Sequence, residues 1–222
     1  MKVFKFGGAS IENTERAKNI ASIIQDYSHD QLLVVISAKG KTTNALEEIA
    51  KNYFNHNTSR ANELFEQLKA DHDQYARELL QDDFAATDKK LQTLYLEIEW
   101  ILNEEPVRDY DYYYDQIVSV GELLSTLIIA SFLNKTAEQA VWLDVRDILK
   151  TDSNYRDATI DWRATQQNTD QLIRPLFEHK NIVITQGFIG STDENNSVTL
   201  GREGSDYTAA VFASMCNAES VT

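Results

Sequence analysis

The sequence predicts an α/β protein in which helices cover a mainly parallel sheet. Residues 32–36 form a continuous apolar run rich in β-branched side chains, which is typical of a strand buried on both faces. The residues before it have the pattern of strand, glycine turn and helix, and two parallel strands joined by a helix normally form a right-handed unit. A further apolar strand is expected at residues 181–185, again after a helical segment. These observations indicate a parallel sheet covered by helices.

The first strand, within residues 1–10, breaks into two glycines before a helix. Gly7 and Gly8 let backbone amides approach a bound group closely, and the N-terminus of the following helix adds partial positive charge, which suits phosphate. Lys5 adds a full positive charge beside them. The alternative is a plain strand-to-helix turn that needs glycine only for its backbone angles, because the pair matches neither of the common glycine-rich phosphate patterns.

The second strand, at residues 31–37, leads into a loop at 37–44 that is rich in hydroxyl groups and lysines. Ligands of open α/β sheets bind at the carboxyl ends of strands, so Ser37 and Thr43 are expected beside the first glycine turn. The alternative is a solvated connection in which Asn44 caps the next helix, expected at residues 45–54. The helix between the two strands is expected to start at Asn13 or Thr14.

A helical hairpin is expected at residues 60–102, because apolar side chains recur there at helical spacing. Its helices are expected to separate near residues 82–88, and Pro106 stops the second helix. We interpret the hairpin as an insertion at about residues 57–105 whose acidic side chains form a solvated face. Residues 108–115, rich in Tyr and Asp, are expected to form a loop.

The helix expected at residues 116–133 carries one unusual charge, Glu122. A carboxylate in so apolar a helix is either exposed on its polar side or buried with a cationic partner, because an unpaired buried charge costs too much free energy. Gly121 beside it would let another group approach the helix closely.

The last part of the chain alternates strands and helices again. A short strand is expected at residues 140–143, followed by a polar connection and a helix that bends at Pro175. After the strand at 181–185, a glycine turn is expected at 186–190 and an exposed hairpin tip at 193–197.

Residues 201–208 combine two glycines, an arginine, a serine and an aspartate just before a helix. Arg202 suits a carboxylate or phosphate through its two-pronged geometry, while Asp206 could orient a lysine or hold a metal. Together with Lys5 and the other glycine turns, this segment indicates phosphoryl transfer, which depends on positioning and on neutralising charge. The substrate is expected to carry a carboxylate.

Composition argues against several classes of function. The 222 residues include 35 acidic and 21 basic side chains, a net charge of −14, which argues against nucleic acid or an anionic membrane as a partner. Cys216 is the single cysteine, so no internal disulfide forms, and no Cys/His pair has zinc spacing. No signal-peptide pattern and no apolar run long enough to span a bilayer is evident. A soluble, cytoplasmic protein is expected.

Four motifs make the prediction more specific. They are KFGGAS at residues 5–10, SVGELLS at 119–125, TQGFIG at 185–190 and TLGREGSDYT at 199–208. In this order they occur in aspartokinases, and the whole chain resembles the amino-terminal part of an aspartokinase, within the amino-acid-kinase superfamily. The resemblance implies a three-layer α/β/α sandwich. It also implies ATP-dependent phosphorylation of the side-chain carboxylate of L-aspartate to 4-phospho-L-aspartate, the first step towards lysine, threonine and methionine.

The resemblance further implies roles for particular residues. Lys5 is expected to neutralise the transferring phosphoryl group, and Asp206 to orient Lys5. Glu122 is expected to bind the substrate ammonium, and Arg202 its α-carboxylate. The other residues expected to contact aspartate or ATP are Ser37, Thr43 and Ser205 for aspartate, and Lys5, Gly7, Gly8 and Ser10 for ATP. Mg²⁺ is expected to accompany ATP, and no metal site made of protein side chains is expected.

Some features depart from the usual aspartokinase pattern. Ala9 stands where threonine is usual, Glu203 stands where glycine is frequent, and the loop at 39–41 carries lysines in place of small residues. The chain also stops before the segment that holds adenine and ribose in aspartokinases and before their regulatory ACT domains. We therefore expect residues 1–222 to be a single, C-terminally truncated catalytic domain with an incomplete nucleotide site. The full-length protein is expected to be a homo-oligomer.

Other interpretations stay open at this point. Glutamate 5-kinase, acetylglutamate kinase and uridylate kinase share the glycine turns, although the motifs of Glu122 and Arg202 favour aspartokinase. The alternative of a different class is a non-catalytic amino-acid-binding fragment, which would bind aspartate without ATP turnover. A plain interaction scaffold would leave the cations and glycines at successive strand ends unexplained.

Overall fold

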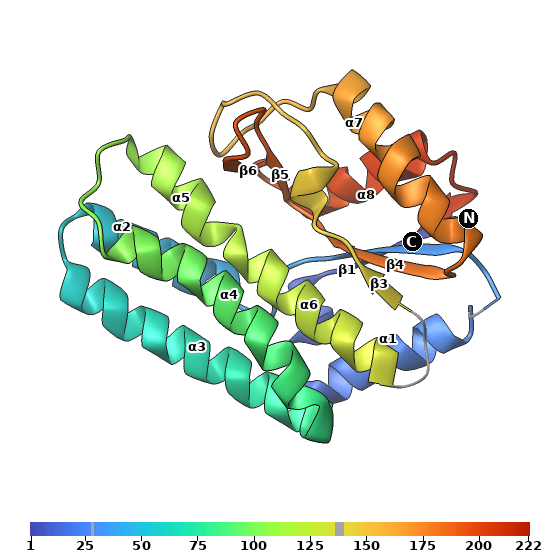
Figure 1. The fold of residues 1–222 in the computed structure, drawn as a ribbon, viewed down its shortest axis with the longest axis horizontal. Coiled ribbons are helices and arrows are strands. Elements are labelled where there is room, and N and C mark those ends of the chain that lie inside the picture. The colour runs from blue at the N-terminus through green and yellow to red at the C-terminus, as the bar shows by residue number, and fades with distance from the viewer. Residues whose placement is uncertain (28, 136–139) are drawn as a thin grey trace.

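The computed structural model describes residues 1–27, 29–135 and 140–222, which form an α/β/α sandwich (Figure 1). Its five-stranded sheet has the order β3-β4-β2-β1-β7. All pairings between these strands are parallel, so the predicted fold class is confirmed. The strands are β1 (Lys2–Phe6), β2 (Leu32–Ile36), β3 (Ala140–Trp142), β4 (Ile182–Gln186) and β7 (Ser220–Val221).

Helices cover both faces of this sheet. In Figure 1, α7 (Trp162–Asn168) and α8 (Gly204–Met215) lie on one side of it, whereas α1 (Thr14–Gln25) and α6 (Val120–Lys135) lie on the other. α8 contacts β1 and β2, and α6 contacts β2, β3 and β4. β2 is wholly buried between these layers, as its unbroken apolar sequence predicts.

The helical hairpin consists of α3 (Thr58–Leu80) and α4 (Phe84–Leu102), which lie beside α2 (Thr42–Phe54) at one end of the molecule (Figure 1). A single 3₁₀ turn at Gln81–Asp83 joins them, slightly earlier than the sequence predicts. The break comes early because Gln81 has a positive φ of 54°, which does not continue a helix, and Phe84 is already buried on α4. α3 packs against α2 and α6, and α4 packs against α6.

The prediction of a loop at residues 108–115 was wrong, because most of this segment belongs to α5 (Tyr110–Val118). Tyr110, Tyr113, Tyr114 and Ile117 have the i, i+3, i+4, i+7 spacing of a helix with one apolar face. Intervening aspartates hide this pattern in the sequence. The helix predicted at 116–133 is also divided, since α5 ends at Val118 and α6 begins at Val120.

α5 and α6 together give an apolar stretch, Tyr110–Lys135, that is long and apolar enough to cross a membrane. The expectation that no such stretch exists was therefore wrong by length and composition. In the structure, 89% of its apolar window is buried inside the fold, and a helix that is apolar on all sides is typical of a protein core as well as of a membrane span. The stretch is thus weak evidence for a membrane span.

The chain between β3 and β4 is less regular. A 3₁₀ turn (Val145–Asp147) follows β3, and α7 continues into a π turn (Thr169–Ile173) and a second 3₁₀ turn (Arg174–Glu178). The helix therefore changes geometry near Pro175, as predicted. After β4, β5 (Ile189–Ser191) and β6 (Ser197–Thr199) form a separate antiparallel hairpin.

Candidate functional site

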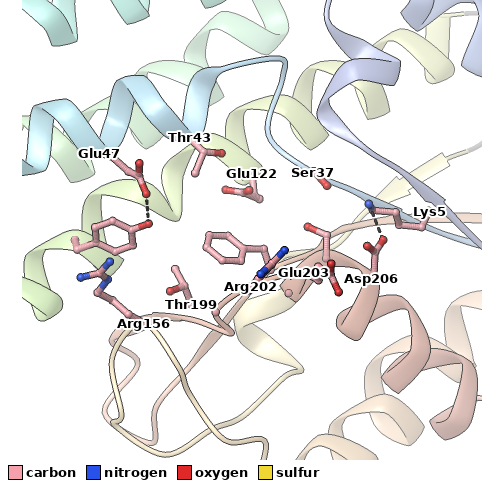
Figure 2. A pocket seen from close by; sticks show the side chains of 15 residues that line it. Lys5, Ser37, Thr43, Glu47, Glu122, Arg156, Thr199, Arg202, Glu203 and Asp206 are labelled. Atoms are coloured by element: carbon pink, nitrogen blue, oxygen red, sulfur yellow. Dashed lines mark hydrogen bonds and ion pairs between the residues drawn. The ribbon is translucent and has the colours of Figure 1, made fainter.

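A cavity of about 470 Å³ lies where the carboxyl ends of β1, β2 and β4 approach the start of α8 (Figure 2). Every residue predicted to bind or activate the substrate lines it: Lys5, Ser37, Thr43, Glu122, Arg202, Ser205 and Asp206. The carboxyl ends of parallel strands meet at one edge of a sheet, so turns that are distant in sequence converge there. The structure therefore brings these predicted residues together.

Lys5 and Asp206 form an ion pair at one end of this cavity, with Nζ 2.7 Å from Oδ1 (Figure 2). Lys5 is in β1, and Asp206 is in the first turn of α8, which packs against β1. A carboxylate in the first turn of a helix is also favoured by the helix dipole. The Lys5 side chain is 23% exposed and the Asp206 side chain 62%, so a ligand can reach the pair. The contact fixes the direction of the lysine ammonium.

Gly187, just after β4, lets the start of α8 approach this edge of the sheet. A Cβ atom on Gly187 would lie 2.6 Å from Cβ of Ser205 and 2.8 Å from its Cα. Side chains do not approach backbone so closely, so only glycine fits between the end of β4 and α8. The positions of Ser205 and Asp206 thus depend on glycine, which has no side chain, at position 187.

Glu122 lies in the first turn of α6 and is only 2% exposed. Its Oε1 accepts a hydrogen bond from the N–H of Ala38 at 3.3 Å, while Oε2 has no partner among the residues that the structure describes. Burial raises the pKa of Glu122 to about 8, although the N–H of Ala38 opposes this shift. The sequence predicted either exposure or a cationic partner, and the described chain supplies neither. A cationic group of a ligand would supply the missing partner.

Arg202 is exposed and has no hydrogen-bond or ion-pair partner within residues 1–27, 29–135 and 140–222, so its guanidinium is available to an anion. The next residue, Glu203, has a left-handed backbone with φ of 58°. This conformation favours glycine, which explains why glycine is frequent at this position, and Glu203 adopts it at a cost in strain. The hydroxyl groups of Ser37, Thr43 and Ser205 also line the cavity without a hydrogen bond to the described chain.

The two glycines after β1 have different surroundings. A Cβ atom on Gly7 would meet only Nζ of Lys5, at 3.6 Å, so open space adjoins the ammonium. A Cβ atom on Gly8 would lie 2.3 Å from the carbonyl oxygen of Ala38, so the fold itself requires glycine there. The backbone at Gly7 is thus open to a group that lies next to the Lys5 ammonium.

The segment after the glycines differs from its prediction. A 3₁₀ turn (Gly8–Ile11) follows them, and α1 starts only at Thr14, where the Asn13 side chain accepts a hydrogen bond from the N–H of Arg16. The N-terminus of α1 therefore does not lie directly at the glycines. Ser10 is not brought to the cavity either, because it lines a separate hollow with Arg16.

Sequence reasoning missed one wall of the cavity, formed by Glu47, Tyr114 and Arg156 (Figure 2). The hydroxyl group of Tyr114 donates a hydrogen bond to Oε1 of Glu47 at 2.5 Å, and the Arg156 guanidinium lies 4.3 Å from the centre of the Tyr114 ring. Burial, together with Glu47, raises the pKa of Tyr114 above its ordinary value. Arg156 also has a left-handed backbone, with φ of 68°. The helical spacing of the tyrosines is the one sequence signal that could have located this wall.

Asp115 fastens this wall to β6. It is fully buried, and its carboxylate accepts hydrogen bonds from the N–H of Arg156 at 2.9 Å, the N–H of Thr199 at 2.9 Å and the Thr199 hydroxyl at 2.7 Å. Burial raises the pKa of Asp115 to about 6, against the effect of these donors. Both Arg156 and Thr199 line the cavity, so the hydrogen bonds of Asp115 position two residues of the cavity wall.

Protein metal ligands do not gather around this cavity. Within the described ranges of the chain, no group of three or more His, Cys, Asp or Glu side chains could hold a metal ion. Asp206 is instead engaged with Lys5. The cavity wall presents charged groups and hydroxyl groups.

Comparison with known proteins gives a consistent set of relatives. Lysine-sensitive aspartokinase 3 of Escherichia coli K12 is 33% identical over 228 residues, which cover 99% of this chain and 47% of the relative. A structure of E. coli aspartokinase III in complex with lysine and aspartate superposes with a TM-score of 0.84 at 28% identity, covering 100% of this chain and 48% of that one. The same enzyme in complex with aspartate and ADP has a TM-score of 0.79 at 28% identity, with the same coverage.

The matches cover nearly all of this chain but only part of each relative. The chain spans between about a quarter and about half of the length of the first curated relatives that it matches. The model described as "Amino acid kinase family" matches residues 1–222. The chain therefore belongs to the amino acid kinase family, in which it is similar to aspartokinases.

Proposed function

We propose that this chain is part of an aspartate kinase, which transfers the terminal phosphoryl group of ATP to the side-chain carboxylate of L-aspartate. The observation that carries the proposal is a shared cavity: it contains the Lys5–Asp206 pair, the buried Oε2 of Glu122 and the Arg202 guanidinium, and neither of the last two groups has a partner among the described residues. L-Aspartate has one ammonium and two carboxylate groups. These three charges complement Glu122, Arg202 and Lys5 respectively.

The relatives support this substrate. The E. coli aspartokinase III structures contain aspartate, and one of them also contains ADP. The similarity to that enzyme extends over the whole length of the present chain. Aspartate and an adenine nucleotide are therefore the natural ligands to propose here.

The residues around the cavity have distinct roles in this proposal. Lys5 neutralises charge on the reacting carboxylate and on the transferring phosphoryl group, and Asp206 orients its ammonium. Glu122 binds the substrate ammonium, Arg202 binds the α-carboxylate, and the hydroxyl groups of Ser37, Thr43 and Ser205 complete the aspartate site. The open space beside Gly7 is consistent with phosphate binding next to Lys5. ATP with Mg²⁺ supplies the phosphoryl group and part of the charge neutralisation.

The product, the cellular location and the assembly of the protein are also proposed from its similarity to aspartokinases. The product would be 4-phospho-L-aspartate, which leads towards lysine, threonine and methionine. We propose a cytoplasmic enzyme that is a homo-oligomer when complete and that has no nucleic-acid or membrane partner. The net charge of −14 supports the last point, because it disfavours binding to polyanions.

Related substrates fit the cavity less well. The amino group of N-acetylglutamate is acylated and carries no positive charge, so it would leave Glu122 without a partner. Glutamate has one more methylene group than aspartate, and one methylene group changes binding in a hydrophobic pocket by about 1–3 kcal/mol. The proposal therefore predicts a preference for aspartate over both.

Calorimetry with this chain tests the substrate. We expect L-aspartate to bind, L-glutamate to bind at least about tenfold more weakly, and N-acetyl-L-glutamate and UMP not to bind. Tighter binding of glutamate or N-acetylglutamate would overturn the aspartate assignment. Turnover is tested separately by aspartate-dependent ADP formation from ATP and Mg²⁺. Aspartate binding without turnover, in a protein that spans the full length of the E. coli relative, would favour the non-catalytic binding module.

A further inference from the structure

Residues 37–43, which are the loop after β2 together with the first two residues of α2, carry two hydroxyl groups of the cavity and are held first by α6. The N–H of Ala38 donates to Glu122, as described above, and the N–H of Lys39 donates to Oγ of Ser125 at 2.8 Å. These contacts place Ser37 and Thr43, at the two ends of the loop, against the wall of the cavity that contains Glu122.

The same loop is held from its other side by an ion pair with the helical hairpin. Nζ of Lys39 lies 2.6 Å from Oδ2 of Asp71 on α3 and 5.1 Å from the centre of the Tyr75 ring. The Lys39 side chain is only 11% exposed, although Asp71 is 62% exposed. A lysine whose stem is covered and whose ammonium faces both a carboxylate and an aromatic ring has lost most of its conformational freedom.

A second contact lies beside this ion pair. The Thr42 hydroxyl is 3.3 Å from Nε2 of His72 on α3, and Nδ1 of His72 is 2.9 Å from the carbonyl oxygen of Leu68. Because a carbonyl only accepts, Nδ1 carries the proton and Nε2 accepts a hydrogen bond from Thr42. His72 is buried, and burial lowers its pKa to about 4, so the ring is neutral at neutral pH.

These polar contacts do not merely fill space. A second cavity of about 470 Å³ adjoins Lys39, Thr42, Asp71 and His72 on the side of the loop that faces α3. Further along the chain α2 packs against α3, whereas beside this cavity the segment meets α3 through the Lys39 ion pair, the Tyr75 ring and the Thr42 hydrogen bond. Lys41 lines this second cavity as well, but its ammonium has no partner among the described residues.

We infer that Lys39 is a positioning residue, which ties the substrate-binding loop to α3 through Asp71 and so holds Ser37, Thr43 and the N–H of Ala38 in place around the ligand. The hairpin is then part of the apparatus that sets the affinity of the site. The inference deepens the proposed function, because it rests on aspartate binding in the cavity beside Glu122.

Three variants and a matched control test this inference by calorimetry with L-aspartate. Lys39→Met and Asp71→Asn should each raise the Kd for aspartate about five- to tenfold. The double variant should bind no more weakly than Lys39→Met alone, because both changes remove one interaction. Lys41→Met removes the same charge from the same loop and should leave the Kd unchanged. An unchanged Kd with fewer competent sites would mean that Lys39 only stabilises the fold, and would overturn the inference.

Hydrogen exchange supplies a readout that needs no ligand. The amides of Ala38 and Lys39 should exchange faster in Lys39→Met and Asp71→Asn than in the wild type or in Lys41→Met. If the wild-type chain binds no aspartate while exchange changes as expected, the proposed function fails and the positioning of the loop by Lys39 stands. If exchange at both amides is unchanged, the positioning itself is refuted.

Discussion

Oε1 of Glu122 accepts a hydrogen bond from the N–H of Ala38 at 3.3 Å, and Oε2 has no partner among the described residues. Because the pKa of Glu122 is raised to about 8 by burial, the group is mostly protonated at neutral pH when the cavity holds no cation. Binding an ammonium group requires the ionised form. Ligand binding is therefore linked to the loss of a proton.

The first prediction follows from this linkage. The affinity for aspartate should rise about tenfold per pH unit from about pH 6 to about pH 8, and then level off. Calorimetry in buffers of different ionisation enthalpy should detect about one proton released per aspartate bound at the lower pH. Glu122→Gln should bind more weakly and lose this pH dependence. A constant affinity over this range would show that Glu122 does not meet the ammonium.

The second prediction concerns the stability of the same variant. The pKa of Glu122 is near its ordinary value of 4.5 in the unfolded chain and about 8 in the folded chain. Folding therefore binds a proton between these values, and the wild type loses about 1.4 kcal/mol of stability for each pH unit as the pH rises between them. Glutamine cannot ionise, so Glu122→Gln should gain stability relative to the wild type from pH 5 towards pH 8. Urea unfolding curves that shift in parallel would contradict this.

The third prediction concerns Arg202. Arg202→Ala should weaken aspartate binding by about 2 kcal/mol, or roughly 30-fold, because the α-carboxylate loses its cationic partner. Its thermal midpoint should not change, since Arg202 is exposed and makes no ion pair within the described ranges. Arg163→Ala, at an exposed position on α7, is the matched control and should bind as the wild type does. If Arg202→Ala and Arg163→Ala bind aspartate with equal affinity, Arg202 does not contact the substrate.

The fourth prediction concerns Asp115. Asp115→Ala should lower the free energy of unfolding by at least about 2 kcal/mol, because buried donors of Arg156 and Thr199 lose their acceptor. Asp111→Ala is the control. It removes the exposed carboxylate that pairs with the Arg156 guanidinium at 3.0 Å, and surface pairs contribute at most about 1 kcal/mol. If the two variants unfold at the same urea concentration, Asp115 is not what holds this wall.

The convergence of the site could be predicted because its main residues stand next to apolar runs. Lys5 belongs to one strand and Ser37 follows the next. Because ligands bind at the carboxyl ends of parallel strands, this rule predicts that both residues lie near the same site, without giving the distance between them. Glu122 stood out as a carboxylate among apolar neighbours. The roles proposed for these residues came from the resemblance to aspartokinases and not from their spacing.

The rest of the site depends on packing that the sequence does not express. Glu47 lies on α2 and Arg156 in a polar connection, and only the fold brings both to Tyr114. A pattern also shows that Glu122 is surrounded by apolar residues without showing whether its partner belongs to the chain. The cationic partner that a buried, ionised Glu122 requires is absent from the described residues, and the ammonium group of the proposed substrate would supply it.

Gly187 has a consequence for how this protein can vary. The 2.6 Å between its hypothetical Cβ and Ser205 closes that position to the other nineteen amino acids, since even alanine would act as a wedge between two segments. Such a wedge would push the start of α8 outwards and carry Asp206 away from Lys5, without altering either charged residue. A substitution at this position, which has no side chain of its own, would thus disrupt the proposed site without changing any of its charged residues.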